Sequence, residues 1–525
     1  MILTKLKSVI QSKYFWLVVV LVLNLYFLKD FCVKKEVLFI DEGFSYGMSN
    51  SSSTFMPDIN EEEVCQYNPS VFHQYLTVQP NEIWNYKQIK KNLVVHPPLY
   101  YFIFHTINLF FMDAFSKWAG LILNIILFLL TQIVLYVLSR QFLDVKKSMQ
   151  VLVFYGFSVA AVCTLVFIRS YMLFTLVTTL LCLLSVKLLQ AAEADKTTDF
   201  YRNLFYICLT LFFSFLTHYY FLIAAFGLCA GICLVLLCYK MYKKLAVFTF
   251  SSLFTIGLVP LLFTCVRRHL FNKQDRSGEV ASTLHENFIN HAFDIEVWTK
   301  FIRKDFLGHI FSPTVLLIIA LIYGAYLLKT HQKINKYIVL LAGTLIFSVL
   351  VISAVIPLDI RGSESAKRYF FHLGPLFALM FVLILELLTR RLKRGFYVSA
   401  ALVLGLLISG WHHPKFSVYF YEYQSAEMFY VRNIKDKTLW IQWEKQMPSW
   451  KLVEPALYAV HAKQFIVFRD FSDDCFQNMW ADENAKQHAA LMLENKGTKP
   501  EDCAIIPGNK LVFSTWAVCA YLPDN

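Results

Sequence analysis

Long apolar runs, separated by short polar stretches, make up most of the chain. These runs cover about residues 14–31, 97–112, 118–138, 149–168, 171–191, 204–217, 219–239, 245–266, 313–328, 337–357, 371–388 and 396–411. Most of them approach the roughly 20 apolar residues that a helix needs to cross the hydrocarbon core of a bilayer. The pattern therefore predicts an all-α, polytopic membrane protein.

The first run follows three basic residues, Lys5, Lys7 and Lys13. A secretory signal peptide also begins with a basic segment and an apolar core, but it ends at a small-residue cleavage site, and none follows this run. We therefore predict that residues 14–31 form an uncleaved first span. The N-terminus then lies in the cytoplasm.

Basic residues gather between the later runs in five patches. The patches are Arg140, Lys146 and Lys147; Lys196 and Arg202; Lys240, Lys243 and Lys244; Lys329, Lys333 and Lys336; and Arg390, Arg391, Lys393 and Arg394. Short cytoplasmic loops carry an excess of lysine and arginine, so all five patches are expected in the cytoplasm. If every run crossed the bilayer, the first patch would fall outside. One run before residue 140 must therefore not cross.

The run at 97–112 fits this requirement. It is short for a span, and Tyr101, His105 and Asn108 place polar groups at helical spacing along one stripe. Such a helix lies in the membrane interface instead of crossing it. About eleven spans then remain, each near the length that a bilayer requires, and the residues after about 412 fall outside.

This topology places three regions on the outer face: a first outer loop at 33–117, a second at 267–312, and a tail at 413–525. The tail alternates strand-like runs with helical stretches. The strand-like runs are 439–441, 465–468 and 511–513, and the helical stretches lie near 453–463 and 476–495. We predict a membrane module over 1–412 and a small extracytoplasmic α/β domain over 413–525. In an oxidising compartment one disulfide can form among Cys475, Cys503 and Cys519.

Composition agrees with a membrane protein and narrows its partners. Of 525 residues, 57% are hydrophobic and only 16% are charged, well below the roughly 25% of a soluble domain. The net charge of +12 is accounted for by the cytoplasmic patches, so it indicates no nucleic-acid partner. The 12 cysteines show no zinc-ligand spacing, and no cofactor is predicted, while a divalent metal stays open.

Two adjacent carboxylates, Asp41 and Glu42, stand where the chain leaves the first span. By position alone they are either ordinary charges of a water-facing loop or functional groups. The other polar residues of the outer face bear on this choice.

Further polar and aromatic side chains fall at the same depth. They are His96, Arg169, Tyr171, His218, Tyr219, Lys367, Arg368 and Tyr369. Each has an ordinary explanation: snorkelling to lipid headgroups, an aromatic belt, an interfacial histidine, or a salt bridge to Glu364. Lys367 and Arg368 are more informative, because cations on the outer side oppose the positive-inside rule. The convergence of the whole set on one face favours a functional site.

A carboxylate beside cations at the bilayer surface suits one kind of reaction. The cations hold a lipid-linked phosphate through charge-assisted hydrogen bonds and stabilise the charge that grows on it as it leaves. The carboxylate acts as a general base toward a hydroxyl. Transfer of a sugar from a polyprenyl phosphate uses these parts, through an oxocarbenium-like state as in glycoside hydrolysis.

Five motifs occur in an order that resembles a known family. They are Asp41-Glu42, His96-Pro97-Pro98-Leu99-Tyr100-Tyr101, Arg169-Ser170-Tyr171-Met172-Leu173, Thr217-His218-Tyr219-Tyr220 and Arg368-Tyr369-Phe370. Together they resemble the GT-C membrane glycosyltransferases, in the branch of the protein O-mannosyltransferases and aminoarabinose transferases. The resemblance covers about residues 10–390.

The resemblance implies a plan for the site. Asp41 and Glu42 are the catalytic acids: Asp41 is the general base toward the acceptor, and Glu42 is its neighbour, whose share in that role stays open. The configuration of the sugar is inverted. The donor phosphate is contacted by Arg169 and Arg368, with Lys367 as a helper. The substrate cavity is lined by His96, Tyr171, His218, Tyr219 and Tyr369.

Two departures from the family leave the sugar and the acceptor open. The second outer loop is far too short for the MIR domain of the eukaryotic protein mannosyltransferases. The aminoarabinose enzymes have Lys-Pro where this chain has His96-Pro97, and Val95 comes before it. No metal site is therefore carried over from them.

We predict an inverting glycosyltransferase of the cell membrane that transfers a monosaccharide from a polyprenyl phosphate to an acceptor hydroxyl at the outer face. The lipid is undecaprenyl phosphate in a bacterium or dolichyl phosphate in a eukaryote, and the acceptor is a glycan, a lipid or a protein. Two other classes stay open, a transporter or flippase of lipid-linked glycans and a non-catalytic scaffold. A transporter carries ionisable residues near the bilayer midplane, whereas charges within these spans, Lys187 and Glu386, lie near cytoplasmic ends.

Overall fold

The computed structural model describes residues 13–51, 56–57, 59–84, 86, 89, 96–264, 266–267, 295–308, 335–356, 364–412, 425–444, 448–496, 503, 506–515 and 517–523. The chain divides into two compact units. The first, called the membrane unit here, consists of Met1–Cys32, Val94–Tyr100 and Asn124–Ser417. The second, called the sheet unit, consists of Val33–Leu93, Tyr101–Leu123 and Val418–Asn525. Most of the first outer loop thus belongs with the C-terminal residues.

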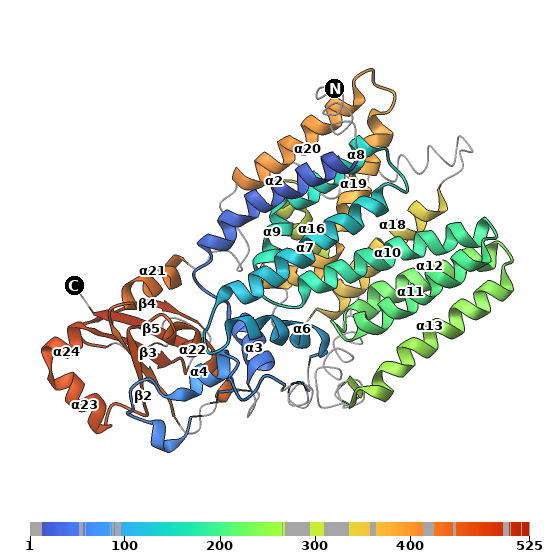
Figure 1. Cartoon of the computed structure of the whole chain (residues 1–525). Coiled ribbons are helices and arrows are strands. Elements are labelled where there is room, and N and C mark those ends of the chain that lie inside the picture. Colours follow the sequence, from blue (N-terminus) through green and yellow to red (C-terminus); the bar gives the residue numbers. More distant parts are fainter. Residues whose placement is uncertain are drawn as a thin grey trace, which may run out of the picture. The chain divides into compact units, whose positions relative to one another are not determined.

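Eight helices among the described residues are long and apolar enough to cross a membrane. They are α2 (Lys13–Lys34), α7 (Lys117–Ser139), α10 (Tyr171–Glu193), α12 (Phe221–Cys238), α13 (Tyr242–Leu262), α18 (Lys336–Val355), the stretch Ala366–Thr389 that ends in α19 (Gly374–Thr389), and α20 (Gly395–His412) (Figure 1). Each of them covers one predicted run. Together with the sheet described below, they confirm a helical, multi-pass membrane protein with a small C-terminal α/β domain.

Three other predicted runs differ from these eight. The run at 149–168 is bent by 56° between α8 (Val145–Gly156) and α9 (Val159–Val166). The Ser158 hydroxyl caps α9 by accepting a hydrogen bond from the Ala161 amide, so a new helix starts at the bend. α11 (Thr197–Phe215) is a helix with Asp199 and Arg202 near its start. The run at 313–328 and the polar residues of the second outer loop at 268–294 lie outside the described residues.

The run at 97–112 forms α6 (Leu99–Asn108) and the short 3-10 helix η2 (Leu109–Phe111). With a rise of about 1.5 Å per residue, this stretch is about 20 Å long. The hydrocarbon core of a bilayer is roughly 30 Å thick. The length is therefore that of the non-spanning helix predicted from the charge pattern.

The sheet unit combines helices of the first outer loop with an α/β domain. The loop provides α3 (Ile40–Asn50), η1 (Glu61–Glu63) and α4 (Ser70–Leu76). The C-terminal residues form α21 (Ser425–Ile434), β1 (Thr438–Gln442), η4 (Ser449–Leu452), α22 (Val453–Ala459), β2 (Gln464–Phe468), α23 (Asp474–Ala481), α24 (Glu483–Gln487), β3 (Ala489–Glu494), β4 (Asn509–Ser514) and β5 (Val518–Pro523).

The strands form one sheet in the order β2-β1-β3-β5-β4. β1 pairs in parallel with β2 and β3, whereas β5 pairs antiparallel with β3 and β4. Parallel strands need a crossover connection. The helix α22 supplies the connection between β1 and β2, and the helices α23 and α24 supply the connection between β2 and β3. Trp440, Phe468 and Leu491 are buried in the core of this domain.

One prediction for the domain is wrong. The stretch 476–495 is predicted to be helical, but helix ends at Gln487 and Ala489–Glu494 is the strand β3. Every residue from Ala489 to Leu493 is buried. A strand covered on both faces lacks the alternation of apolar and polar residues that marks a half-exposed strand, so its pattern is ambiguous.

Two disulfides join described residues of the sheet unit. Cys503 is bonded to Cys519 within the C-terminal domain, while Cys475 is bonded to Cys65 of the first outer loop. Next to this second bond, the Cys65 amide donates a hydrogen bond of 2.7 Å to the Val467 carbonyl. The loop thereby runs along the open edge of the sheet at β2 and covers it.

Candidate functional site

The predicted acids Asp41 and Glu42 lie in the first turn of α3. Glu42 is fully buried, and its Oε2 accepts hydrogen bonds from Lys35 Nζ at 2.9 Å and from the Phe39 amide at 2.7 Å. The Lys35 and Glu42 side chains are only 5% and 0% exposed. Breaking a buried ion pair leaves an uncompensated charge, so this contact strongly fixes the start of α3. Glu42 therefore anchors the helix.

Asp41 has a different environment from its neighbour. It is partly exposed, and it stands at the N-terminus of α3, where free amide groups and the helix dipole favour a negative charge. A general base must be both charged and accessible to the proton that it removes. Of the two predicted acids, Asp41 has the placement that suits this role.

α3 is held on several sides within the sheet unit. The Tyr46 hydroxyl donates a hydrogen bond of 2.8 Å to the Ser116 carbonyl, and its ring packs against Phe104. His105 Nδ1 lies 2.8 Å from the Ser49 carbonyl oxygen. Buried polar groups that have partners make the structure around them rigid. The helix that carries Asp41 is thus set in a fixed frame.

The predicted cation Arg169 lies in the turn that precedes α10. Just before it, Asn124 Nδ2 of α7 donates hydrogen bonds to the carbonyls of Leu165 and Phe167 at 2.8 and 2.9 Å. These bonds fix the path of the chain at the turn. Arg169 is 8% exposed, and a guanidinium that is shielded from water makes stronger hydrogen bonds to an anion.

Four predicted residues, Tyr171, His218, Arg368 and Tyr369, meet in one aromatic cluster of the membrane unit, and Tyr220, which was not predicted as a site residue, links them. The ring centroids are 5.3 Å apart for Tyr171 and His218, 5.6 Å for His218 and Tyr220, and 4.8 Å for Tyr220 and Tyr369. The Arg368 guanidinium lies 5.4 Å from the centre of the Tyr369 ring, which is a cation–π contact. α10, the turn before α12, and η3 (Glu364–Leu373) thus bring these residues together.

Two further residues that were not predicted as site residues complete the aromatic cluster. The Phe174 ring stacks with His218 at 5.0 Å and with His372 at 3.8 Å. Phe174 follows Tyr171 by three positions in α10, and His372 follows Tyr369 by three positions in η3. Residues with this spacing lie on one face of a helix. The spacing is the sequence signal that identifies them.

Lys367 has a different environment from Arg368. Its Nζ donates a hydrogen bond of 3.1 Å to Asp305 Oδ1, and the two side chains are 1% and 2% exposed. Asp305 is the last residue of α16 (Ile295–Asp305), which packs against η3. The ion pair joins these two elements, and Arg368 is the partly exposed cation of the two.

The segment after His96 meets the turn between α11 and α12, and this turn contains Tyr219. The Leu99 amide donates a hydrogen bond of 2.8 Å to the Leu216 carbonyl, which joins the segment after His96 to the end of α11. Tyr219 and Leu99 belong to one apolar cluster. The structure therefore groups Tyr219 with the His96 segment, and His218 with the aromatic cluster.

The predicted site residues are thus described as two sets. Asp41 and Glu42 belong to the sheet unit, and the cations and cavity residues belong to the membrane unit. Each unit holds its own set in place through buried ion pairs and packed rings.

Among the described residues, one group has side-chain atoms close enough together to hold a metal ion, namely Cys65, Asp473 and Cys475. Its two sulfurs form a disulfide, whereas metal binding by cysteine requires thiolates. In this state the group acts as a covalent link between the loop and the domain.

No protein-family model matches the sequence, and no curated protein matches it. Among solved structures, the chain is similar to the crystal structure of ArnT from Cupriavidus metallidurans bound to undecaprenyl phosphate. The match has a TM-score of 0.36 and 12% sequence identity, and it covers 92% of this chain and 96% of that chain. A likeness at this level transfers no site residue or activity, so the function is derived from the contacts described above.

Proposed function

We propose that the protein is an inverting glycosyltransferase that transfers a monosaccharide from a polyprenyl-phosphate donor to an acceptor hydroxyl at the outer face of the membrane. The observation that carries this proposal is the unequal environment of two adjacent acids. Glu42 is buried against Lys35, while Asp41 is partly exposed at the same helix terminus. One acid thus holds the helix, and the other is partly exposed, as a general base toward an acceptor hydroxyl must be.

In the proposed reaction, the Asp41 carboxylate takes the proton of the acceptor hydroxyl. The acceptor oxygen forms a bond to the anomeric carbon on the face opposite the phosphate. The bond between the anomeric carbon and the phosphate oxygen breaks, and its electron pair stays on the lipid phosphate. The proton ends on Asp41, and the anomeric configuration is inverted, as in other single displacements at this centre.

Arg169 and Arg368 are the proposed contacts of the departing phosphate. A guanidinium offers planar, fixed donors to two phosphate oxygens and stabilises the charge that develops on them. Lys367 is proposed to support Arg368 indirectly, because its ion pair with Asp305 holds the segment that carries Arg368.

His96, Tyr171, His218, Tyr219 and Tyr369 are the proposed lining of the substrate cavity. Aromatic rings combine apolar faces with polar edges. The faces suit the isoprenoid chain and the apolar side of a sugar ring, and the hydroxyl and imidazole groups suit sugar hydroxyls. No metal or cofactor takes part in the proposed step.

The proposed orientation places the N-terminus in the cytoplasm and the sheet unit outside the cell. It is supported by the two disulfides, both of which lie in the sheet unit, because disulfides persist in oxidising compartments. Reporter fusions after Lys146 and after Asp482 check the orientation. After Lys146, a reporter that is active in the cytoplasm is expected to give a signal. After Asp482, a reporter that is active outside the cell is expected to do so. An outside signal at Lys146 contradicts the proposed orientation.

A turnover assay with the purified full-length protein in detergent tests the reaction. Radiolabelled polyprenyl-phosphate sugars are offered one at a time to the wild type, to Asp41→Asn and to Arg169→Ala. One donor is expected to lose its sugar, and removal of the general base is expected to lower the rate by about 10²–10⁴. Unchanged turnover in Asp41→Asn contradicts the assignment of the base.

A transporter or flippase of lipid-linked glycans is the alternative. Transporters hold ionisable residues near the bilayer midplane. The ion pairs described between candidate spans join helix ends instead, Lys147 of α8 with Glu386 of α19 and Lys336 of α18 with Glu193 of α10. A flippase would move the donor between the leaflets of a vesicle with its sugar–phosphate bond intact, and that result would favour the alternative.

A further inference from the structure

α3 depends on its surroundings for its position. It has 11 residues, and isolated helices of this length are only marginally stable in water. Nine of its residues are buried, including Glu42, Ser45, Ser49 and Asn50. The elements that pack against α3 therefore determine where its first turn, and with it Asp41, is placed.

Two glycines let these elements approach α3 closely. Gly43 and Gly47 are four positions apart, so they lie on one side of the helix. A Cβ atom at Gly47 would overlap the ring of Tyr75 in α4. A Cβ atom at Gly43 would lie 2.7 Å from Val453 Cγ1 and 3.0 Å from Leu457 Cδ1 of α22. Close approach of this kind requires glycine.

The contact at Gly43 is made by the C-terminal domain. Val453 and Leu457 are buried and four positions apart in α22, so they present one continuous ridge to α3. Gly43 directly follows the Asp41-Glu42 pair in the first turns of α3. A shift of α22 would therefore be felt where the predicted base stands.

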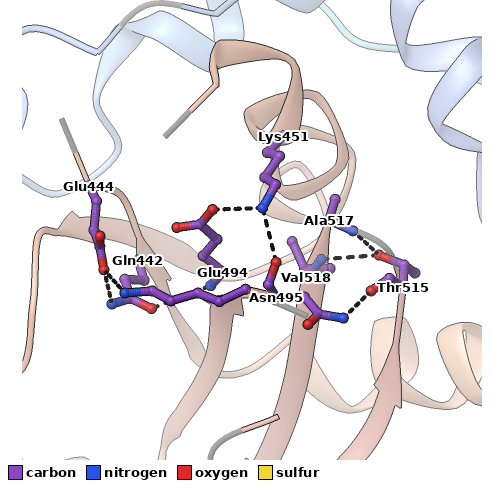
Figure 2. A network of polar contacts seen from close by, with 9 residues as sticks. Gln442, Glu444, Lys451, Glu494, Asn495, Thr515, Ala517 and Val518 are labelled. Carbon is purple, nitrogen blue, oxygen red and sulfur yellow. Dashed lines mark hydrogen bonds and ion pairs between the residues drawn. The ribbon is translucent and has the colours of Figure 1, made fainter. Parts of the chain in front are cut away.

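α22 is itself fixed to the sheet by a polar network at its start (Figure 2). Lys451 Nζ donates hydrogen bonds to Glu494 Oε1 at 2.6 Å and to the Asn495 carbonyl at 2.9 Å. Glu454 Oε2 accepts a hydrogen bond of 2.9 Å from the Thr515 hydroxyl. Lys451 and Glu454 flank Val453 closely in sequence, so the network holds the residue that touches Gly43.

The first outer loop is joined to the domain at other points too. Cys65 and Cys475 form a disulfide, and the Arg432 guanidinium makes two hydrogen bonds of 3.0 Å to the Glu36 carboxylate. These contacts lie on both sides of α3 in the sequence. The loop that carries Asp41 is thus attached to the C-terminal domain before and after the helix.

We propose that the C-terminal domain positions α3, and with it Asp41, for the transfer reaction through the contact of Val453 and Leu457 with Gly43. Val453 and Leu457 are positioning residues in this assignment. The inference rests on the proposed function, because it needs Asp41 as the base.

Kinetics of Gly43→Ala in the full-length protein test the inference. Alanine favours a helix more than glycine does, so the substitution leaves α3 helical and displaces it from α22. Because a misplacement of about 1 Å can lower a rate by about 100-fold, kcat is expected to fall at least about tenfold. The KM for the donor is expected to stay within about twofold, because the donor phosphate is assigned to the membrane unit.

Compensation separates positioning from general damage. Val453→Ala removes the nearest methyl group that the new Cβ would meet, so Gly43→Ala with Val453→Ala is expected to regain most of kcat. Gly405→Ala is the matched control, since a Cβ there meets nothing within 4 Å, and it is expected to leave kcat unchanged. An unchanged kcat in Gly43→Ala, a parallel rise of the donor KM, or a loss that Val453→Ala does not restore would overturn the inference.

Two further measurements keep the outcomes distinct. If Gly43→Ala gives no folded protein, Leu457→Ala loosens the same contact without added bulk, and the same loss of kcat is expected; full kcat overturns the inference. Asp41→Asn is measured in parallel. Loss of turnover in Asp41→Asn with full turnover in Gly43→Ala removes only the positioning role, whereas full turnover in Asp41→Asn removes the proposed base and this inference with it.

Discussion

The candidate site residues include one pair of adjacent like charges in the sheet unit and one in the membrane unit. In each pair, the two residues have different roles. In the sheet unit, Glu42 is buried in an ion pair with Lys35, and its neighbour Asp41 is partly exposed. The buried acid holds the first turn of α3. The exposed acid is presented by that turn.

The membrane unit repeats this arrangement with the opposite sign. Lys367 is buried in an ion pair with Asp305, and its neighbour Arg368 is partly exposed beside the Tyr369 ring. Adjacent residues of like charge therefore need not share a role. Under the proposed function, one member of each doublet stabilises its unit and the other takes part in the transfer reaction.

The largest expected effect on stability comes from breaking a buried ion pair. Lys35→Met or Lys367→Met leaves a buried carboxylate without its cation, and each is expected to destabilise its unit by about 3–5 kcal/mol. The melting temperature of the purified protein measures this loss. Lys34→Met is the control beside Lys35, because Lys34 is exposed, and it is expected to have little effect.

A double variant sharpens this test. Replacing both partners, as in Lys367→Met with Asp305→Leu, removes both charges from the interior, and apolar replacements of a buried pair are often neutral. The double variant is therefore expected to recover most of the stability that Lys367→Met loses. Single variants that melt like the wild type would show that the buried pairs do not hold their segments.

A buried acid that accepts a hydrogen bond from a hydroxyl gives the contrasting case. Glu454 is 7% exposed and accepts a hydrogen bond from Thr515. Burial raises the pKa of Glu454 from its ordinary 4.5 to about 7, the Thr515 hydrogen bond lowers it, and the nearby Glu427 carboxylate raises it. The buried Tyr458 hydroxyl is another titratable group that interacts with Glu454.

The sign of the pH dependence follows from this raised pKa. The native state binds the proton more tightly than the unfolded chain does, so the stabilisation is complete below about pH 4.5 and is lost as the pH rises through about 7. The pKa difference corresponds to about 3 kcal/mol. Glu454→Gln is expected to remove this slope, which melting temperatures between pH 5 and 8 would reveal. An identical slope in wild type and variant would assign it to other groups.

The smallest expected effect concerns Arg368, the partly exposed cation beside the Tyr369 ring. Arg368→Ala removes a donor to the proposed phosphate, and hydrogen bonds to charged groups contribute about 1.5–3 kcal/mol. Donor binding is therefore expected to weaken by roughly 10- to 100-fold, with little change in melting temperature. Arg368→Lys keeps the positive charge but lacks the planar guanidinium. Its donor affinity is therefore expected to lie between those of the wild type and Arg368→Ala. A large drop in melting temperature with normal donor binding would show that Arg368, like Lys367, stabilises the membrane unit instead.

The long apolar helices and the shorter α6 could be predicted because the length that a bilayer requires acts along the sequence itself. The run at 97–112 was separated from the spans by the positions of basic residues far from it, such as Lys146 and Lys147. The strand β3 was missed because a strand covered on both faces has a uniformly apolar pattern. A short apolar run of this kind is ambiguous until its neighbours are known.

The partners of the buried charges could not be predicted, because they depend on contacts between distant segments. Asp305 lies 62 positions before Lys367, and Cys475 lies 410 positions after Cys65. Lys35 lies only seven positions before Glu42, but several other lysines share its predicted outer loop, and no pattern distinguished it from them. Lys35 and Lys367 are both held by buried acids.

The central claim is that Asp41 and Glu42 have separate roles, and a comparison of Asp41→Asn with Glu42→Gln tests it most directly. Both variants remove one negative charge at adjacent positions, and kcat and melting temperature are measured on the same preparations. Asp41→Asn is expected to lower kcat by at least about 100-fold with an unchanged melting temperature. Glu42→Gln is expected to lower the melting temperature, because Lys35 loses its partner, while the folded protein keeps most of its kcat. Equal losses of kcat in the two variants, or full turnover in Asp41→Asn, would contradict the account.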